Sequence, residues 1–413
     1  MTYRDVVSRQ VLTWACTTIG ARMPVAMAPL ALVFLVRERP GGYSLGAIIA
    51  AAYVLGEIVG APVLGMRLRP ERARRQLAAG LALGSAGFLG LGVFPGAHPV
   101  VLVGFACLAG AAPSAATGAL RTLLSSLVPE RSVAQALSAE SILMAGVWAL
   151  SPAAVAGLAL GVASHVPLLL AAGLMASSVG GLWLLPAGWD AGGPDGAGGT
   201  GAPLLRVLVG AWPVYVTGAA SLTLLGLSEL VLPALLEQRG IGVGWSGPLL
   251  AGMAVGGGLG AFLYGLRGWP GLLRTRSLVL TAGTSVCVTL AALIPRMPGI
   301  AVALVVGGML QSGAMITRNL SLREVLPPGA LAAGYSVMYA AAGAGYAATG
   351  SLAGALLKVT APSTAILAGV GLTALLTVTG WWGEVRRAGR AARDVDVAVV
   401  RSAKSGASKR SWQ

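Results

Sequence analysis

The chain has 413 residues, of which 56% are hydrophobic and 10% are charged, and 61 are glycine. Soluble domains contain about 25% charged residues, so this composition excludes an ordinary soluble domain and indicates a polytopic membrane protein. The net charge of +15 does not predict a nucleic-acid partner, because the basic residues follow a topological pattern that is described below.

Twelve apolar runs, bounded by charges, proline or glycine, predict twelve transmembrane helices. Their expected ranges are 11–36, 44–66, 76–95, 99–124, 132–160, 165–186, 205–236, 245–266, 277–295, 299–320, 330–357 and 362–383. At 1.5 Å per residue, runs of about 20 residues reach across the ~30 Å hydrocarbon core of a bilayer. The runs are continuously apolar, without the period-2 alternation of strands, so the predicted fold class is all-α integral membrane.

A segment rich in glycine, GWDAGGPDGAGGTGAP, separates the sixth run from the seventh. Its composition is typical of a flexible linker. We therefore expect a six-helix bundle over 1–186, a cytoplasmic linker over 187–204, a second six-helix bundle over 205–383 and a basic cytoplasmic tail over 384–413. Residues 1–10 lead directly into the first long run, which we interpret as a retained span rather than a signal peptide.

The basic residues are unevenly distributed between the two faces of this arrangement. Of 29, we place 21 in loops or tails on one face and five on the other, and three lie inside spans: Arg22, Arg121 and Arg318. Short cytoplasmic loops collect Arg and Lys, so both termini are expected in the cytoplasm. Arginine far outnumbers lysine, as in high-GC bacterial genomes, which favours the bacterial cell (inner) membrane.

The two halves of the chain resemble each other in sequence. The stretch AAYVLGEIVGAPVLG at 51–65 aligns without a gap on AGMAVGGGLGAFLYG at 251–265. GALRTLLSSLVPE in the fourth run has a counterpart in MITRNLSLREVLPP of the tenth, so that Arg121 and Arg318 occupy equivalent places. Parallel repeats of this kind predict a substrate path between two pseudo-symmetric bundles, near the middle of the membrane.

Twelve spans arranged as six plus six, with a basic loop after the second span and an echo after the eighth, resemble the major facilitator superfamily. The family's loop motif is only partly present: Gly65, Arg74 and Arg75 match it, and Glu71 is the acidic residue near its missing Asp. The resemblance implies that these four residues form a gating loop. It also implies a monomeric secondary transporter that works by alternating access. The stretches around 19–36 and 43–65 are most similar to bacterial drug and metabolite exporters.

Carboxylates inside apolar runs are candidates for proton coupling, because a coupled carrier needs a group that is neutral facing one side and charged facing the other. The candidates are Glu229, Glu57 and Glu140. Glu229 has no basic residue within a turn, although a hydrogen bond that only serves packing explains it equally. Glu57 is expected to pair with Arg22, either for structure or as part of a charge relay. Glu140 is expected to pair with Arg121 as a gate or a packing bridge.

Cationic and aromatic side chains are the candidates for substrate contact. Arg22, Arg121 and Arg318 could attract an anionic group, although Arg121 and Arg318 could instead extend to the cytoplasmic interface. Tyr335 and Tyr339 share one helical face with Tyr346, which suits either stacking on a ligand or ordinary helix packing.

The sequence contains no phosphate-binding loop, no paired carboxylates at catalytic spacing and no metal-ligand spacing, so we expect no cofactor and no metal, and the proton gradient as the driving force. We therefore interpret the chain as a transporter, not an enzyme, whose partners are a small-molecule substrate, protons and the lipid bilayer. Proton-coupled efflux of a small organic molecule, such as a natural product or drug, is the first hypothesis. Import or facilitated passage of an anionic metabolite is the alternative, and a membrane enzyme or sensor is a third possibility.

Overall fold

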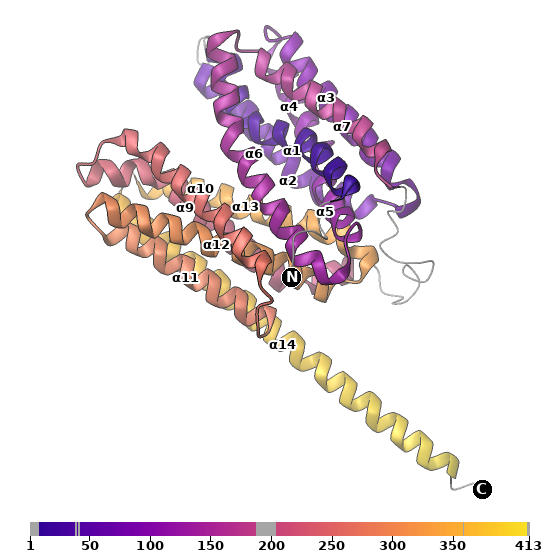
Figure 1. Cartoon of the computed structure of the whole chain (residues 1–413). Helices are drawn as coiled ribbons and strands as arrows, with labels where there is room; N and C mark the ends of the chain where they lie inside the picture. Colours follow the sequence, from indigo (N-terminus) through magenta and orange to yellow (C-terminus); the bar gives the residue numbers. More distant parts are fainter. Residues whose placement is uncertain (1–7, 38, 40–41, 187–203, 358, 411–413) are drawn as a thin grey trace.

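The computed structural model describes residues 8–37, 39, 42–186, 204–357 and 359–410. These residues form two helical bundles (Figure 1), and no strand occurs among them. The first half comprises α1 (Arg9–Val36), α2 (Gly42–Arg67), α3 (Ala73–Val93), α4 (Pro99–Ala111), α5 (Ala115–Ser126), α6 (Val133–Gly161) and α7 (Val166–Leu184). The second half comprises α8 (Leu204–Gly210), α9 (Trp212–Gln238), α10 (Ser246–Leu266), α11 (Leu273–Leu293), α12 (Met297–Val325), α13 (Leu331–Leu356) and α14 (Pro362–Arg410). Four 3-10 turns, at Pro70–Arg72, Glu130–Ser132, Val243–Trp245 and Pro328–Ala330, lie in the connections.

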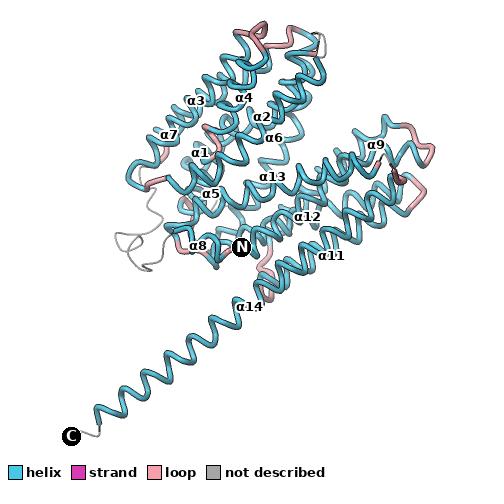
Figure 2. The backbone as a smooth tube through the Cα atoms, turned by 180° about the vertical axis from the view of Figure 1, so that it is seen from behind, coloured by secondary structure: helices cyan, strands magenta, loops and turns pink. Residues whose placement is uncertain are grey.

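The helices have the lengths and compositions of membrane spans. Eleven helical segments in the described residues are long and apolar enough to cross a membrane, with α4 and α5 forming one of them. The 26-residue α13 packs along α9 and fills the place of the remaining predicted span. Short loops connect the helices, as the view from behind shows (Figure 2). The prediction of a twelve-span, all-helical membrane fold in two bundles is confirmed.

Local sequence signals set where several helices begin. The hydroxyl of Ser8 accepts a hydrogen bond from the backbone N–H of Val11 at 3.2 Å, which caps the start of α1. Pro99 occupies the first position of α4, where its missing N–H costs nothing. The side chain of Gln76 accepts from the backbone N–H of Arg69 at 2.9 Å and so closes the turn between α2 and α3.

Three expected boundaries differ from the structure. The fourth predicted span, 99–124, is divided into α4 and α5 around Pro113, because proline cannot continue the backbone hydrogen-bond ladder. The seventh is divided into α8 and α9 at Ala211, just before Pro213. The last helix does not end at residue 383 but continues as α14 to Arg410 and projects from the bundle (Figure 1). Of the expected linker, 187–203 lie outside the described residues and Leu204 begins α8.

The internal repeat corresponds to a repeated helix packing. A Cβ added at Gly56 on α2 would lie 2.8 Å from the carbonyl oxygen of Cys107 on α4. At the equivalent Gly256 on α10, an added Cβ would meet the carbonyl of Val305 on α12 even more closely. Only a residue without a side chain allows such close helix contact, so the shared glycines bring the second span of each half against the fourth.

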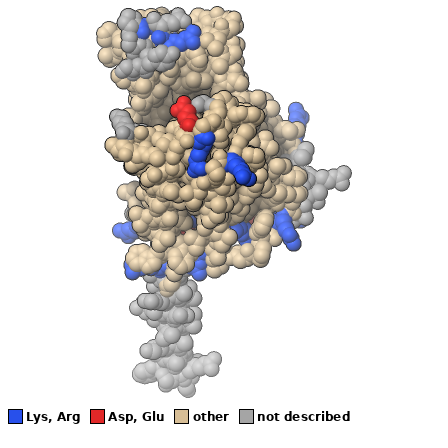
Figure 3. Space-filling model, turned by 90° about the vertical axis from the view of Figure 1, so that its left-hand side faces the viewer, with Lys and Arg blue, Asp and Glu red and all other residues tan. Residues whose placement is uncertain are grey.

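The two halves contact each other at one end and diverge at the other (Figures 1 and 2). We call the end where α1 begins and α14 projects the terminal end, and the opposite one the open end. The apolar core of the first half continues at the terminal end into the second half, through Ala261, Tyr264 and Ile316. Figure 3 shows the surface hollowed between the halves, and few charged side chains on this face. The gap between the halves is therefore accessible from the open end.

We expect Gly256→Ala to lower the apparent melting temperature of the protein in detergent, because the new Cβ collides with the backbone of Val305 and overpacking costs about 1–3 kcal/mol. Gly258→Ala is the control, since its Cβ would have no atom within 4 Å. Thermal unfolding followed by fluorescence measures both. Equal melting temperatures for the two variants would refute the role of Gly256 in helix packing.

Candidate functional site

One face of α13 connects the ionisable groups of the predicted path. Tyr335, Tyr339 and Tyr346 lie on this face, four and seven residues apart, and each contacts a different ionisable side chain. The three contacts follow one another along the helix from the terminal end towards the open end. The tyrosines were predicted as a ligand-stacking or packing face. In the structure Tyr335 packs in a core cluster and the Tyr346 ring packs against α9, and all three hydroxyls also donate hydrogen bonds.

The middle contact joins the two halves through Tyr339. Its hydroxyl donates a hydrogen bond to Glu57 Oε1 on α2 at 3.0 Å. The guanidinium of Arg22 on α1 lies 4.5 Å from the centroid of the Tyr339 ring and donates to the hydroxyl of Thr117 on α5. Arg22 and Glu57 do not form the direct ion pair that the sequence suggested. They are close together, but a tyrosine from the second half lies between them.

The contact nearest the terminal end is built on an ion pair. Arg121 Nε lies 2.9 Å from both carboxylate oxygens of Glu140, and Arg121 Nη2 lies 2.8 Å from Glu140 Oε1. From this pair, Arg121 Nη1 donates to Asn319 Oδ1 on α12 at 3.3 Å, and the guanidinium lies 5.5 Å from the centroid of the Tyr335 ring. The pair expected within the first half is therefore also attached to the second half.

Close backbone packing seals the same end. Ser336 on α13 is fully buried and lies between Gly65 on α2 and Gly118 on α5. A Cβ added at Gly65 would lie 2.7 Å from the Cβ of Ser336, and one at Gly118 would lie 2.8 Å from its backbone nitrogen. The halves therefore meet at van der Waals distance here, without room for a solvent path.

The contact nearest the open end involves Glu229. Its Oε2 accepts a hydrogen bond from the hydroxyl of Tyr346 at 3.0 Å. Glu229 is half-buried on α9, and it forms no salt bridge with a described Lys or Arg. Tyr346 lies two helical turns from Tyr339, but its ring packs against Gly226 on α9, within its own half. Glu229 is thus a half-buried carboxylate whose hydrogen-bond partner in the described part of the chain is a phenol.

Arg318, predicted as a cavity residue, lies elsewhere. Its side chain is 1% exposed inside the second half, where Nη1 lies 2.5 Å from Glu384 Oε1 and 2.7 Å from the hydroxyl of Thr217. Sequence reasoning missed Glu384, because this residue looked like the first residue of a solvated tail. Since α14 does not end at 383, Glu384 stays on a buried face and neutralises Arg318.

Only one of the four predicted gating-loop residues contacts the other half. Gly65 packs against Ser336, as described above. Arg74 donates to the backbone carbonyl of Leu185, at the end of α7 in its own half, and lies over the ring of Trp183. Glu71 and Arg75 are exposed and form no hydrogen bond or ion pair with the described part of the chain. Of the four, only Gly65 therefore takes part in the close packing between the halves.

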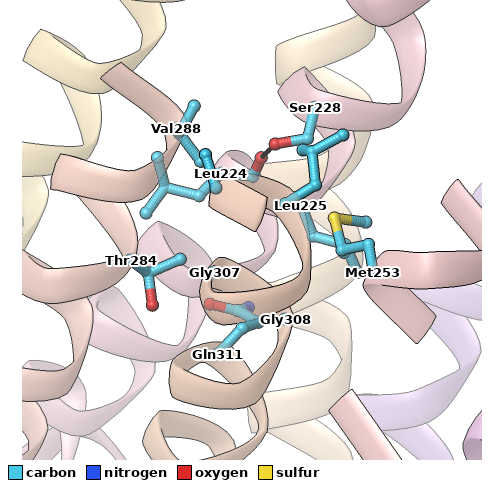
Figure 4. A pocket seen from close by; sticks show the side chains of 11 residues that line it. Leu224, Leu225, Ser228, Met253, Thr284, Val288, Gly307, Gly308 and Gln311 are labelled. Carbon is cyan, nitrogen blue, oxygen red and sulfur yellow. Dashed lines mark hydrogen bonds between the residues drawn. The ribbon is translucent and has the colours of Figure 1, made fainter. Parts of the chain in front are cut away.

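A separate small cavity lies inside the second half, among α9, α10, α11 and α12 (Figure 4). Its volume is about 20 Å³, which is room for about one water molecule and too little for an organic substrate. Gln311 lines it, donating through Nε2 to the carbonyl of Ser221 at 2.7 Å, while its buried Oε1 has no partner.

We expect Gly118→Ala to separate the halves at the terminal end, because the backbone of Ala332 and Ser336 leaves no space for the new methyl group. A cost of about 1–3 kcal/mol would lower the ratio of closed to open molecules by about fivefold to a hundredfold. Distances between spin labels on α5 and α13 at this end measure that ratio. Gly146→Ala is the matched control, with no atom within 4 Å of the added Cβ. A closed fraction unchanged by Gly118→Ala would contradict the assignment.

We expect Glu384→Ala to destabilise the protein by about 3–5 kcal/mol, because the change leaves the buried Arg318 guanidinium without its counter-charge. Denaturant unfolding in detergent measures the loss. The exposed Glu324 provides the control, since Glu324→Ala removes a carboxylate from the same end of the second half without uncovering a buried charge. Equal stability of the two variants would show that the Arg318 pair is dispensable.

The arrangement of helices matches solved transporter structures. The human organic anion transporter MFSD10 matches with a TM-score of 0.69 at 12% identity, over 91% of this chain and 98% of that one. The major facilitator superfamily transporter FucP, in the outward conformation, gives 0.65 at 14% identity over 92% and 99%. A bacterial homologue of the iron transporter ferroportin, in an outward-facing state, gives 0.68 at 16% identity over 91% and 98%.

No family model matches the sequence, and the comparison with curated proteins gives no match. At identities of 12–16%, the structural likeness speaks for the fold, and it extends over nearly the whole chain. The contacts between helices are consistent with this fold. The second span of each half packs against the fourth, α2 on α4 and α10 on α12, and α13 contacts α2 and α5 of the first half. The chain therefore has the fold of the major facilitator superfamily transporters, as the pattern of its spans and loops predicted.

Proposed function

We propose that the chain is a secondary transporter that exports a small organic molecule in exchange for protons, by alternating access between its two halves. The excess of Arg and Lys at the terminal end supports a cytoplasmic location for that end. On this assignment the described arrangement is outward-facing, with the gap open to the outside and the cytoplasmic side sealed.

The observation that carries this proposal is the uneven distribution of contacts between the halves. The hydrogen bond from Arg121 to Asn319, the glycine contacts of Ser336 and the hydrogen bond from Tyr339 to Glu57 all cross from one half to the other in the middle or at the terminal end. Each is small and local, so rocking one bundle against the other breaks these contacts without unfolding a helix. Such a joint suits a protein that alternates between two arrangements.

The three predicted carboxylates have different hydrogen-bond partners, which suggests different roles. Glu229 and Glu57 each accept a hydrogen bond from a tyrosine hydroxyl, and neither is within salt-bridge distance of a described Lys or Arg. Groups held in this way suit binding and release of a proton. Glu140 is held by two nitrogens of Arg121, which suits a fixed ion pair. We therefore assign proton coupling to Glu229 and Glu57, and closure of the terminal end to Glu140.

Transport of an anionic metabolite is the second candidate, and Arg22 is the observation that favours it. Among the predicted cations, Arg121 and Arg318 are paired with carboxylates, whereas the buried Arg22 contacts a hydroxyl and an aromatic ring. The nearby Glu57 still balances the charge of Arg22 electrostatically, which makes anion binding the weaker proposal. The carboxylate of Glu229, which has no basic partner in the described part of the chain, also argues against anion binding.

We expect Glu229→Gln to abolish the dependence of transport on pH, because glutamine keeps the shape of the side chain but cannot exchange a proton. The measurement is growth inhibition across a compound panel in an efflux-deficient bacterial host, with and without a protonophore, followed by uptake into vesicles at several pH values. The exposed Glu237 on the same helix provides the control Glu237→Gln.

Resistance that is lost with Glu229→Gln and with the protonophore, but kept in the control, would support proton-driven export and identify the substrate class. Transport by Glu229→Gln with the pH dependence of the unmodified chain would remove Glu229 from the mechanism. Absence of resistance despite confirmed membrane expression would favour the second candidate, and uptake assays with anionic metabolites would then decide.

A further inference from the structure

A buried hydroxyl without a partner lies next to the contact between the halves. Tyr53 on α2 is 1% exposed, and its ring packs against Phe88 on α3 with centroids 6.0 Å apart. Its hydroxyl has no hydrogen-bond partner in the structure. The same hydroxyl is within electrostatic range of Glu57, Tyr339 and Arg22. The sequence did not predict Tyr53 as a site residue, because several tyrosines lie in apolar runs and nothing distinguishes this one.

Helix geometry brings Tyr53 and Glu57 onto one face of α2. Residues four apart on a helix are neighbours, and side chains lean towards the N-terminus of their helix. The side chain of Glu57 therefore leans back over the turn that carries Tyr53. In the described arrangement, Glu57 Oε1 instead accepts its hydrogen bond from Tyr339 of the other half.

The missing partner has an energetic consequence. A buried hydroxyl that loses its hydrogen bond to water is unfavourable unless it finds another acceptor. A charged acceptor within electrostatic range, the Glu57 carboxylate, already accepts a hydrogen bond from Tyr339 of the other half. An acceptor becomes available to Tyr53 when Tyr339 withdraws with the second half.

We propose that Tyr53 is a positioning residue that takes over Glu57 when the halves rearrange. In the described arrangement, the hydroxyl of Tyr339 donates to Glu57 and that of Tyr53 is unpartnered. In the alternate arrangement, Tyr339 has moved away and Tyr53 donates to the same carboxylate. Glu57 thus exchanges a donor from the opposite half for a donor from its own helix. This exchange rests on the alternating access proposed above.

The exchange has a role in the transport cycle. A carboxylate left without any donor in the apolar interior would raise the energy of the alternate arrangement. With Tyr53 in place, the carboxylate has one hydroxyl donor in both arrangements, so neither is strongly favoured. Because one hydrogen bond replaces another, the two arrangements stay close in energy.

The test compares Tyr53→Phe with Tyr339→Phe, which each remove a hydroxyl and keep the ring. Spin-label distances across the open end, measured in lipid without added substrate, give the fraction of molecules in the described arrangement. Tyr339→Phe should lower the ratio of the described to the alternate arrangement by about tenfold, and Tyr53→Phe should raise it by about tenfold. Shifts in the same direction, or no shift with Tyr53→Phe, would overturn the exchange.

A second comparison separates action through Glu57 from a general packing effect. In a Glu57→Ala background, Tyr53→Phe should no longer shift the ratio, because the shared acceptor is gone. A shift that persists in this background would overturn the proposal, and would indicate that Tyr53 is served by a buried water or by packing alone. Tyr215→Phe is the control, since Tyr215 also has a buried, unpartnered hydroxyl but lies in a different core cluster of the second half.

The unmodified chain distinguishes failure of this inference from failure of the proposed function. If it populates two arrangements and Tyr53→Phe leaves their ratio unchanged, the exchange is wrong while alternating access stands. If it populates a single arrangement under all conditions, alternating access fails, and the exchange fails with it.

Discussion

The cost of placing ionisable groups in an apolar interior is the constraint on which this structure depends. Every such group needs a partner, and the partners decide how the halves are joined. Three tyrosines on α13 supply contacts to Arg121, to the Arg22 and Glu57 cluster, and to Glu229, at three successive depths. Two of these contacts cross between the halves. One helix face therefore satisfies the buried polar groups and, at the same time, holds the protein in one arrangement.

The two halves repeat the same helix packing but use their equivalent arginines differently. Arg121 faces the interface, paired with Glu140 and bound to Asn319 of the other half. Arg318, its counterpart in the repeat, is enclosed in its own half by Glu384 on the last helix. A repeat that preserves backbone packing has thus kept the position of the arginine and changed the source of its counter-charge. As a result, the first half carries the interfacial ion pair, and the second half supplies Tyr335 and Asn319, which contact its arginine.

The fold followed from the sequence because apolar length, loop charge and the repeated glycines each depend only on local composition. The pairing of Arg121 with Glu140 and the proximity of Arg22 and Glu57 were also accessible, since neighbouring spans at similar depth restrict the choice. The partners of Arg318 and the tyrosine between Arg22 and Glu57 were not. Both depend on helices far apart in the sequence, and on an α14 that continues past its apolar residues. No pattern in one helix reports where another helix lies.

Alternating access requires the halves, which are sealed around Ser336 in this arrangement, to separate at the terminal end. Ser336→Cys, in a chain whose Cys16, Cys107 and Cys287 are replaced by alanine, places one thiol in that fully buried position. Its reaction with a membrane-impermeant thiol reagent is measured in vesicles of each orientation. The account predicts slow labelling from the side that carries the termini and none from the opposite side. Labelling from the opposite side, or no labelling from either side during active transport, would contradict it.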